Sequence, residues 1–289
     1  MWKRKVALLA GASLLTLTAC SSQQSDQPTV AASFYPLAWV AQEVAGPDAQ
    51  VINLTTPGTE PHDLELTVKQ TAQIAKADVV FYEKGLQPSV DDAVASSTGS
   101  VVEATEYASL VGGSAGKGSD PHVWLDPTQL SKIAAGFTES ISKADPDHAD
   151  GYRARGELLQ RNLAKLDRDL QRGLKTCSNR TVVVAHDAFG YLGRRYDLHI
   201  VPIAGLSPDA EPSAKQLAAI KKAAQEAKVT TVFSETLASP ALADTLAREL
   251  GVETAVLDPI EGLAEGSKDD YITLMRANLD ALRKANQCS

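Results

Sequence analysis

The sequence predicts an α/β protein of two lobes, in which parallel-type sheets are covered by helices and one long helix joins the lobes. Short β-branched runs alternate with helical patterns in two separate series, which is typical of parallel sheets. One long amphipathic stretch, residues 147–176, separates the two series. A helix between two strand-helix series indicates a spine that joins two lobes.

The first series forms an N-terminal lobe, expected over residues 29–145. Its helices are expected at Thr67–Ala77 and Pro127–Ala144, and the second of these opens with Asp126-Pro127, a cap followed by a proline at the first helical position. The expected strands are Val30–Phe34, Val51–Leu54, Asp78–Tyr82 and Val101–Ala104.

The linking segment, residues 146–176, carries leucines at steps of four, three, four and four, which place them on one helical face. They are Leu159, Leu163, Leu166, Leu170 and Leu174. At about 1.5 Å per residue such a helix reaches roughly 45 Å, enough to run along both lobes. A coiled-coil segment is the alternative, but the pattern is short for one.

The second series forms a C-terminal lobe, expected over residues 177–289. The expected strands are Thr181–Ala185, Ile200–Ala204, Thr230–Phe233 and Thr254–Leu257, and the expected helices are Ser213–Ala227, Pro240–Leu250 and Asp269–Asn286. The alternation again favours a parallel sheet covered by helices.

The N-terminus has the pattern of a secretory signal. Three basic residues at positions 3–5 precede the apolar run Val6 to Leu17, which is too short to cross a bilayer comfortably. The run ends in Leu17-Thr18-Ala19-Cys20, which resembles the lipobox of bacterial lipoproteins. We therefore expect a signal peptide at residues 1–19, lipid on Cys20 and a polar tether at residues 20–28. An ordinary signal peptide with a chance cysteine is the alternative.

Two cysteines remain once Cys20 is assigned to lipid, namely Cys177 and Cys288. In an exported chain a disulfide between them is the natural expectation. Two free buried thiols are the alternative, because sequence alone does not give their geometry.

The net charge argues against nucleic acid as a partner. Without the three basic residues at positions 3–5, 25 basic residues stand against 36 acidic ones, so the formal charge is −11. An acidic surface of this kind repels phosphate backbones, whereas it is compatible with a cation as ligand.

Three of the five histidines lie where a metal site would be built. His62 follows the second expected strand in Pro61-His62-Asp63, and His186 ends the apolar run 182–185. His122 lies in Asp120-Pro121-His122-Val123-Trp124. Open α/β sheets bind ligands beyond the carboxyl ends of their strands, where His62 and His186 should point. The other two, His148 and His199, are expected at the surface.

Metal-bound imidazoles need acceptors for their second ring nitrogen. Asp63, Asp120 and Asp187 are close enough in sequence for this task, with helix capping or solvent exposure as alternatives. Glu60, next to His62, is a candidate for an auxiliary ligand or a cap.

Taken together, four motifs resemble those of the zinc- and manganese-binding solute-binding lipoproteins of bacterial ABC importers. They are Ala32-Ser33-Phe34-Tyr35-Pro36-Leu37, Pro61-His62-Asp63, Pro121-His122-Val123-Trp124-Leu125-Asp126-Pro127 and His186-Asp187-Ala188-Phe189-Gly190-Tyr191. The resemblance runs from about Val30 to the C-terminus. It implies a metal held between two lobes and handed to an ABC permease in the membrane by a monomeric receptor.

The resemblance also implies a fourth ligand, an Asp at a late strand end, which corresponds here to Asp258 in Val256-Leu257-Asp258-Pro259. An Asp-Pro after an apolar strand is also a common start of a turn, so the residues alone leave both readings open. Glu235, at the end of another strand, resembles a family position near the site and is expected beside the ligands.

Three imidazoles and one carboxylate suit four-coordinate Zn²⁺. Mn²⁺, the less favoured alternative, prefers more oxygen ligands, and manganese carriers of the family typically have Glu at the position of His186. Many zinc members carry a His-rich loop before the motif of His122, but residues 111–119 contain no histidine. A metallochaperone or direct capture from solution would have to replace it.

A secreted zinc hydrolase is the rival function. A catalytic zinc keeps an open coordination position, whereas four protein ligands close the sphere. The chain also lacks a His-Glu-x-x-His motif. The sequence therefore favours a receptor over an enzyme, and it leaves surface adhesion open as a third class.

Overall fold

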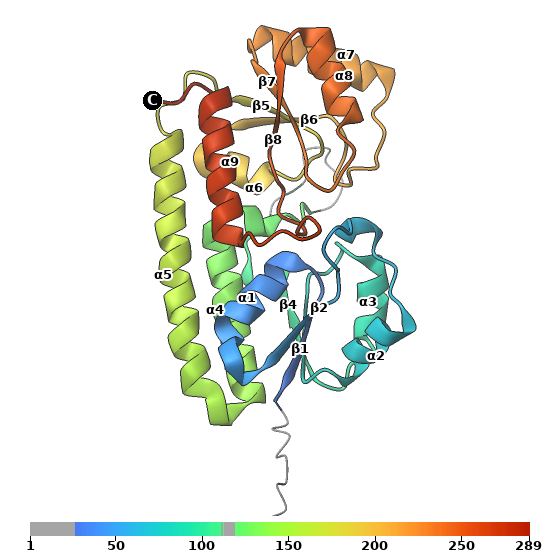
Figure 1. Ribbon diagram of the computed structural model, residues 1–289, viewed down its shortest axis with the longest axis vertical. Coiled ribbons are helices and arrows are strands. Elements are labelled where there is room, and N and C mark those ends of the chain that lie inside the picture. Colours follow the sequence, from blue (N-terminus) through green and yellow to red (C-terminus); the bar gives the residue numbers. More distant parts are fainter. Residues whose placement is uncertain (1–26, 111, 113–118) are drawn as a thin grey trace, which may run out of the picture.

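The computed structural model describes residues 27–110, 112 and 119–289. Two α/β lobes lie one above the other, and a long helix runs along both (Figure 1). This confirms the predicted fold class. The expected signal peptide, Cys20 and most of the expected tether lie outside the described residues. Among the described helices, none is both long and apolar enough to span a membrane.

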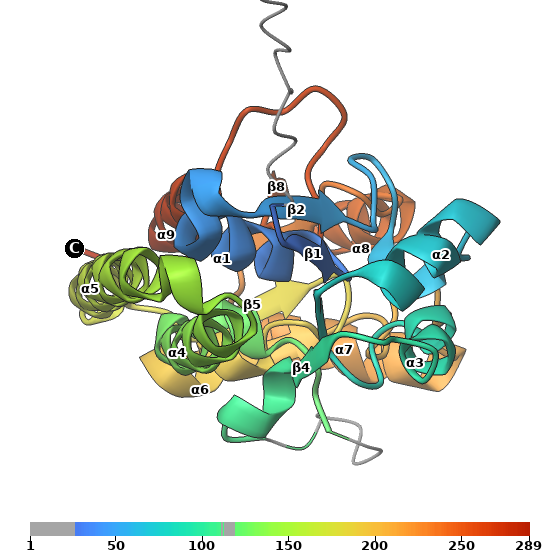
Figure 2. The same ribbon diagram turned by 90° about the horizontal axis from the view of Figure 1, so that it is seen from below.

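The N-terminal lobe contains a parallel sheet with strand order β2-β1-β3-β4. Helix α1 (Tyr35–Ala45) and α4 (Pro127–Ala144) pack on one face, and α2 (Val68–Lys76) and α3 (Pro88–Val94) lie on the other (Figure 2). The strands are β1 (Thr29–Ala32), β2 (Gln50–Asn53), β3 (Val79–Tyr82) and β4 (Ser100–Glu103).

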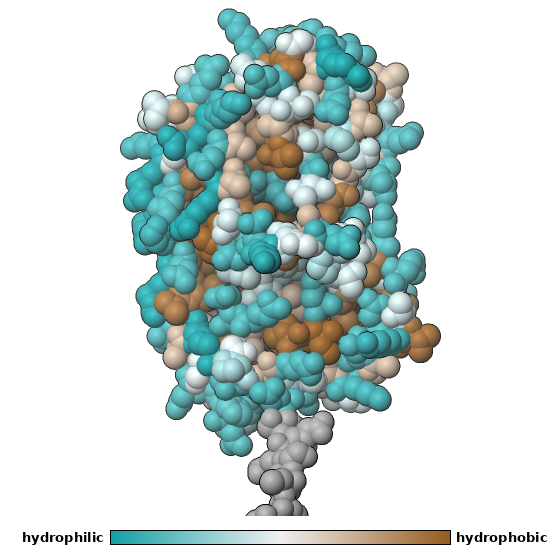
Figure 3. All heavy atoms as spheres, viewed as in Figure 1, coloured by the Kyte–Doolittle hydropathy of each residue, from teal (hydrophilic) through white to brown (hydrophobic). Residues whose placement is uncertain are grey.

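The C-terminal lobe has the equivalent order β6-β5-β7-β8, again parallel. Its strands are β5 (Thr181–Val184), β6 (His199–Pro202), β7 (Thr231–Ser234) and β8 (Glu253–Val256), and its helices are α6 (Gly190–Tyr196), α7 (Ala214–Glu226), α8 (Ala241–Leu250) and α9 (Tyr271–Ala285). Polar residues cover much of the face shown in Figure 3.

Local sequence explains where several helices begin. The side chain of Asp126 accepts a hydrogen bond from the backbone N–H of Thr128, and Pro127 occupies the first turn of α4, as predicted. Thr67 with Gln70 and Ser213 with Gln216 form capping boxes at the starts of α2 and α7. These caps satisfy backbone donors that have no partner within the helix.

The spine is helix α5 (Ala149–Leu174), whose 26 residues span about 39 Å. Its five predicted leucines are all buried. The helix packs against α1 and α4 in the first lobe and against α6 and α9 in the second. The largest buried apolar cluster accordingly runs through both lobes, which the spine joins into one body.

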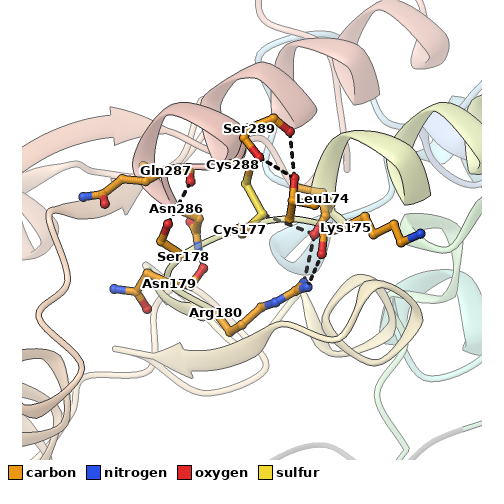
Figure 4. Close-up of a disulfide and its surroundings, with 12 residues drawn as sticks. Leu174, Lys175, Cys177, Ser178, Asn179, Arg180, Asn286, Gln287, Cys288 and Ser289 are labelled. Atoms are coloured by element: carbon orange, nitrogen blue, oxygen red, sulfur yellow. Dashed lines mark hydrogen bonds between the residues drawn. A yellow bond between two sulfur atoms is a disulfide. The ribbon is translucent and has the colours of Figure 1, made fainter.

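The predicted disulfide joins Cys177, just after the spine, to Cys288 at the C-terminus (Figure 4). Arg180 supports the same end of the spine, donating to the carbonyl oxygens of Leu174 and Lys175 at 2.9 and 2.8 Å. These carbonyls lie at the end of the helix, where they need outside donors. The disulfide therefore ties the end of α9 to a well-capped end of α5.

Candidate metal centre

The three predicted histidines converge between the lobes. His62 lies in the short 3₁₀ turn Pro61–Asp63, which follows β2, and His122 comes just before another such turn, Val123–Leu125. His186 follows β5 of the second lobe. The side chains of His122 and His186 are fully buried, whereas that of His62 is 10% exposed.

The fourth member of this cluster is Glu261, in the loop after β8. One potential ligand atom from each of His62, His122, His186 and Glu261 lies within 4.8 Å of all the others. Asp258 is not in the cluster, so the expectation that it would complete the site is wrong. Its two carboxylate oxygens accept instead from the backbone N–H of Ile260 at 2.7 Å and the hydroxyl of Thr236 at 2.6 Å.

The spacing within the cluster fits a tetrahedral metal. Ligand atoms that lie about 2.0–2.1 Å from a tetrahedral Zn²⁺ are roughly 3.3 Å apart. Oε1 of Glu261 lies 3.4, 3.0 and 3.2 Å from Nε2 of His62, His122 and His186, respectively. Nε2 of His122 lies 3.4 Å from Nε2 of His186. Four of the six ligand-to-ligand distances are therefore near the tetrahedral value.

Each of the two buried imidazoles is held by its own carboxylate. Oδ1 of Asp120 accepts both the backbone N–H of His122, at 3.0 Å, and its ring Nδ1–H, at 2.7 Å. Oε1 of Glu235 does the same for His186, at 3.0 and 2.6 Å. A proton on Nδ1 leaves the lone pair on Nε2, which faces the centre of the cluster, free for a metal.

The other candidate residues lie elsewhere around the site. Glu60 accepts from the backbone N–H of His62 at 3.2 Å, which makes it a cap of the 3₁₀ turn. Asp187 is buried but does not serve Nδ1 of His186, a place that Glu235 takes. Asp63 is largely exposed. His148 and His199 are exposed, as predicted.

A glycine brings the two lobes into close approach at Asp120. A Cβ atom added to Gly190, at the start of α6, would lie 2.4 Å from Oδ2 of Asp120. Any side chain at position 190 would therefore push on the carboxylate that orients His122. The Gly in the His186-Asp187-Ala188-Phe189-Gly190 motif is thus explained by packing against the opposite lobe.

Electrostatics bind protons to the site when no metal is present. Burial lowers the pKa of His186, but hydrogen bonds to Glu235 and Glu261 outweigh it and raise the pKa to about 10. The pKa of His122 is also raised, because hydrogen bonds to Asp120 and Glu261 exceed the effect of burial. Burial raises the pKa of Glu261, but hydrogen bonds to the three histidines outweigh it and hold this pKa well below the usual range. In the metal-free site a protonated His186 therefore lies beside the ionised carboxylate of Glu261.

Sequence reasoning missed Glu261, which is 1% exposed. It follows Asp258 by three positions, in Asp258-Pro259-Ile260-Glu261-Gly262-Leu263. Glu261 lies between the apolar residues Ile260 and Leu263, which is unusual for an acidic residue at the surface. This apolar context was the sequence signal for a buried carboxylate, but the family resemblance pointed to Asp258 instead.

Comparison with known proteins supports this interpretation. The family model described as zinc-uptake complex component A, periplasmic, matches residues 30–285. The zinc-binding lipoprotein AdcA of Streptococcus pneumoniae is 35% identical over 98% of this chain and 61% of its own length. The chain therefore spans less than two thirds of that relative. The high-affinity zinc uptake system protein ZnuA of Bacillus subtilis is 34% identical over 91% of this chain and 89% of its own.

A solved structure agrees with both. The Zn(II)-bound ZnuA-like domain of Streptococcus pneumoniae AdcA superposes with a TM-score of 0.77, at 35% identity, over 90% of this chain and 99% of that one. The family match, residues 30–285, extends over both lobes and spans the positions of all four cluster residues. The chain therefore belongs to the family of periplasmic zinc-uptake component A proteins.

Proposed function

We propose that this protein is an extracytoplasmic receptor that captures Zn²⁺ and delivers it to an ABC importer in the membrane. The observation that carries the proposal is the set of three imidazole nitrogens and one carboxylate oxygen at tetrahedral spacing. Both lobes contribute to this set, so a bound ion would hold them together. A receptor of this kind needs a permease as partner, and a lipid on Cys20 would keep it at the membrane.

The donor set favours Zn²⁺ over Mn²⁺. Three neutral imidazoles and one carboxylate match the nitrogen-rich, four-coordinate sites of zinc, whereas Mn²⁺ prefers octahedral oxygen ligands. Two nearby carboxylates, Asp120 and Glu235, are already committed to the Nδ1 atoms of His122 and His186. They are therefore poorly placed to add the oxygen ligands that Mn²⁺ would need.

The same geometry argues against a zinc hydrolase. Catalytic zinc sites have three protein ligands and an open position for water. Here four side chains occupy the tetrahedral positions, and three of them are buried. A closed sphere suits tight capture rather than Lewis-acid catalysis.

Metal analysis tests the proposal directly. The protein is purified without added metal, its metal content is measured by mass spectrometry, and Zn²⁺ is then titrated against excess Mn²⁺. We expect one zinc per chain, with little displacement by manganese. The control is His122→Ala, which should lose this zinc. A wild-type protein that retains manganese in preference to zinc would refute the choice of metal, and one that binds neither would refute the function.

Zinc uptake should release at least one proton, because His186 is protonated at neutral pH when no metal is bound. The pKa of His186, at about 10, means that zinc must displace a proton from this residue at pH 7.5. Zinc affinity should therefore fall on acidification, by about tenfold per pH unit for each proton released. Calorimetric titration in two buffers of different ionisation enthalpy measures the number of protons. Identical enthalpies in both buffers would contradict the prediction.

The pH dependence of folding stability has opposite signs in the metal-free and the zinc-bound protein. In the metal-free protein the raised pKa of His186 stabilises the fold below pH 6.5, and this contribution is lost as pH rises towards about 10. In the zinc-bound protein the imidazoles are held deprotonated, so zinc-linked stability is present at neutral pH and lost as pH falls. Thermal unfolding with and without zinc, measured at pH 5 and pH 8, separates the contribution of protonated His186 from that of bound zinc.

A further inference from the structure

Asp258, which the sequence predicted to be a metal ligand, instead holds the turn that leads from β8 to Glu261. Both carboxylate oxygens of Asp258 are engaged, Oδ1 by the backbone N–H of Ile260 and Oδ2 by the hydroxyl of Thr236 on the adjacent strand end. The first bond closes the turn on itself, and the second fixes the turn to the end of β7. Asp258 therefore fixes the turn that precedes Glu261 to the end of β7.

The backbone of Asp258 is clamped as well. The side chain of Asn278, on α9, accepts the backbone N–H of Asp258 at 2.8 Å and donates to its carbonyl oxygen at 2.7 Å. Asn278 is 2% exposed, so this pair of hydrogen bonds is shielded from water. The start of the turn is thus fixed from two sides, by β7 and by α9.

The turn is strained, and the strain explains why it needs this support. Ile260 has φ of +56°, a left-handed conformation that β-branched residues rarely adopt. Such a conformation is strained in a β-branched residue and persists only where the surroundings enforce it. Ile260 is fully buried, and its N–H is the one that Asp258 accepts. Its conformation sets the direction in which the next residue, Glu261, leaves the turn.

A third support comes from the opposite lobe. The indole Nε1–H of Trp124 donates to the carbonyl oxygen of Pro259 at 2.7 Å, and the carbonyl of Trp124 accepts from the hydroxyl of Tyr271 at 2.5 Å. Trp124 follows His122 by two residues. The segment that carries one imidazole therefore also holds the turn that carries the carboxylate.

We propose that Asp258 is a positioning residue, which holds the Asp258–Ile260 turn so that Glu261 is presented to the metal, and that it does not itself bind the metal. This inference rests on the proposed zinc-binding function. The hydrogen bonds of Asp258 require an acceptor toward Ile260 and a partner for the hydroxyl of Thr236. They do not require a negative charge.

Two substitutions of Asp258 distinguish positioning from ligation. Asp258→Asn keeps an acceptor for the N–H of Ile260 and can donate to the oxygen of Thr236, so zinc affinity should stay within about threefold of wild type. Asp258→Ala removes both contacts, and affinity should fall by at least about tenfold, as for other residues that orient ligands. Affinity is measured on the full chain by competition with a chelator.

Cobalt gives a readout that a general loss of stability does not produce. Tetrahedral Co²⁺ absorbs strongly in the visible range, and its spectrum reports the ligand set. Co²⁺-loaded Asp258→Asn should show the wild-type spectrum, whereas Asp258→Ala should show a changed one. An Asn variant as defective as the Ala variant would overturn the inference, and so would an Ala variant equal to wild type.

Controls separate this inference from the proposed function. Glu261→Ala and His122→Ala should both lose zinc if the site is as described. If both retain wild-type affinity, the proposed function fails, whatever Asp258 does. If Asp258→Ala does not fold, Thr236→Val takes its place, since it releases only Oδ2 of Asp258. This variant should bind zinc more weakly, and unchanged affinity would overturn the inference.

Discussion

Replacing His186 by Ala should weaken zinc binding by at least about 100-fold. A structural zinc site of four ligands contributes roughly 10–16 kcal/mol of binding free energy, so the loss of one ligand removes several kcal/mol. His186 is also the only histidine of the four-residue cluster that comes from the second lobe. Its removal leaves Glu261 as the one cluster residue on that side, and Glu235 loses the imidazole that it orients.

The matched control is His148→Ala. His148 is exposed, and its Nδ1 lies 2.7 Å from a carboxylate oxygen of Asp145, near the start of the spine. This variant makes the same chemical change far from the cluster and should bind zinc like wild type. The measurement is a pair of zinc titrations at pH 7.5. Equal affinities for the two variants would remove His186 from the site.

Removing the disulfide should destabilise the fold by about 5 kcal/mol. Cys177 and Cys288 are 111 residues apart, and on the chain-entropy model a closed loop of this length restricts the unfolded chain by about that amount. For a chain of this size the corresponding fall in Tm is roughly 10 °C. The variant is Cys177→Ser with Cys288→Ser, and thermal unfolding is the measurement.

Zinc affinity should be unchanged in this double variant. The disulfide lies near the C-terminus, at the end of the molecule away from the interface between the lobes (Figure 1). The metal cluster is formed by residues of both lobes at that interface. Treating wild type with a reductant should reproduce the fall in Tm, whereas the double variant should be insensitive to it. Wild type and variant that unfold at the same temperature would contradict the prediction.

Much of the fold could be predicted because local signals were strong. All eight strands found among the described residues lie within one or two positions of the expected ranges, since β-branched runs between turn residues mark parallel strands. Helix α1 was not identified individually, because nearly all of its residues are buried and it has no polar face to give a period. Helices α3 and α6, with seven residues each, are too short to show one.

The residues of the metal site likewise differ in whether a local sequence signal identifies them. His62, His122 and His186 could be chosen from sequence, because three such placements after strand ends or in proline-flanked loops occur together and their motifs resemble those of one family. Asp120 could also be predicted, because it lies two residues from its partner His122 in the sequence. Glu235 was expected from its strand end, but its pairing with His186 spans 49 residues and needed the structure.

The sequence by itself determined the two lobes, the spine and three of the four residues of the cluster, because each has a local signal. Only the tertiary structure decided between Asp258 and Glu261. The physical reason is the direction of the chain after β8: the positive φ of Ile260 turns Glu261 toward the three imidazoles, while Asp258 is held against Thr236 and the backbone of Ile260. A backbone conformation that is rare for isoleucine is imposed by contacts with β7, α9 and the opposite lobe, and no local pattern reveals it.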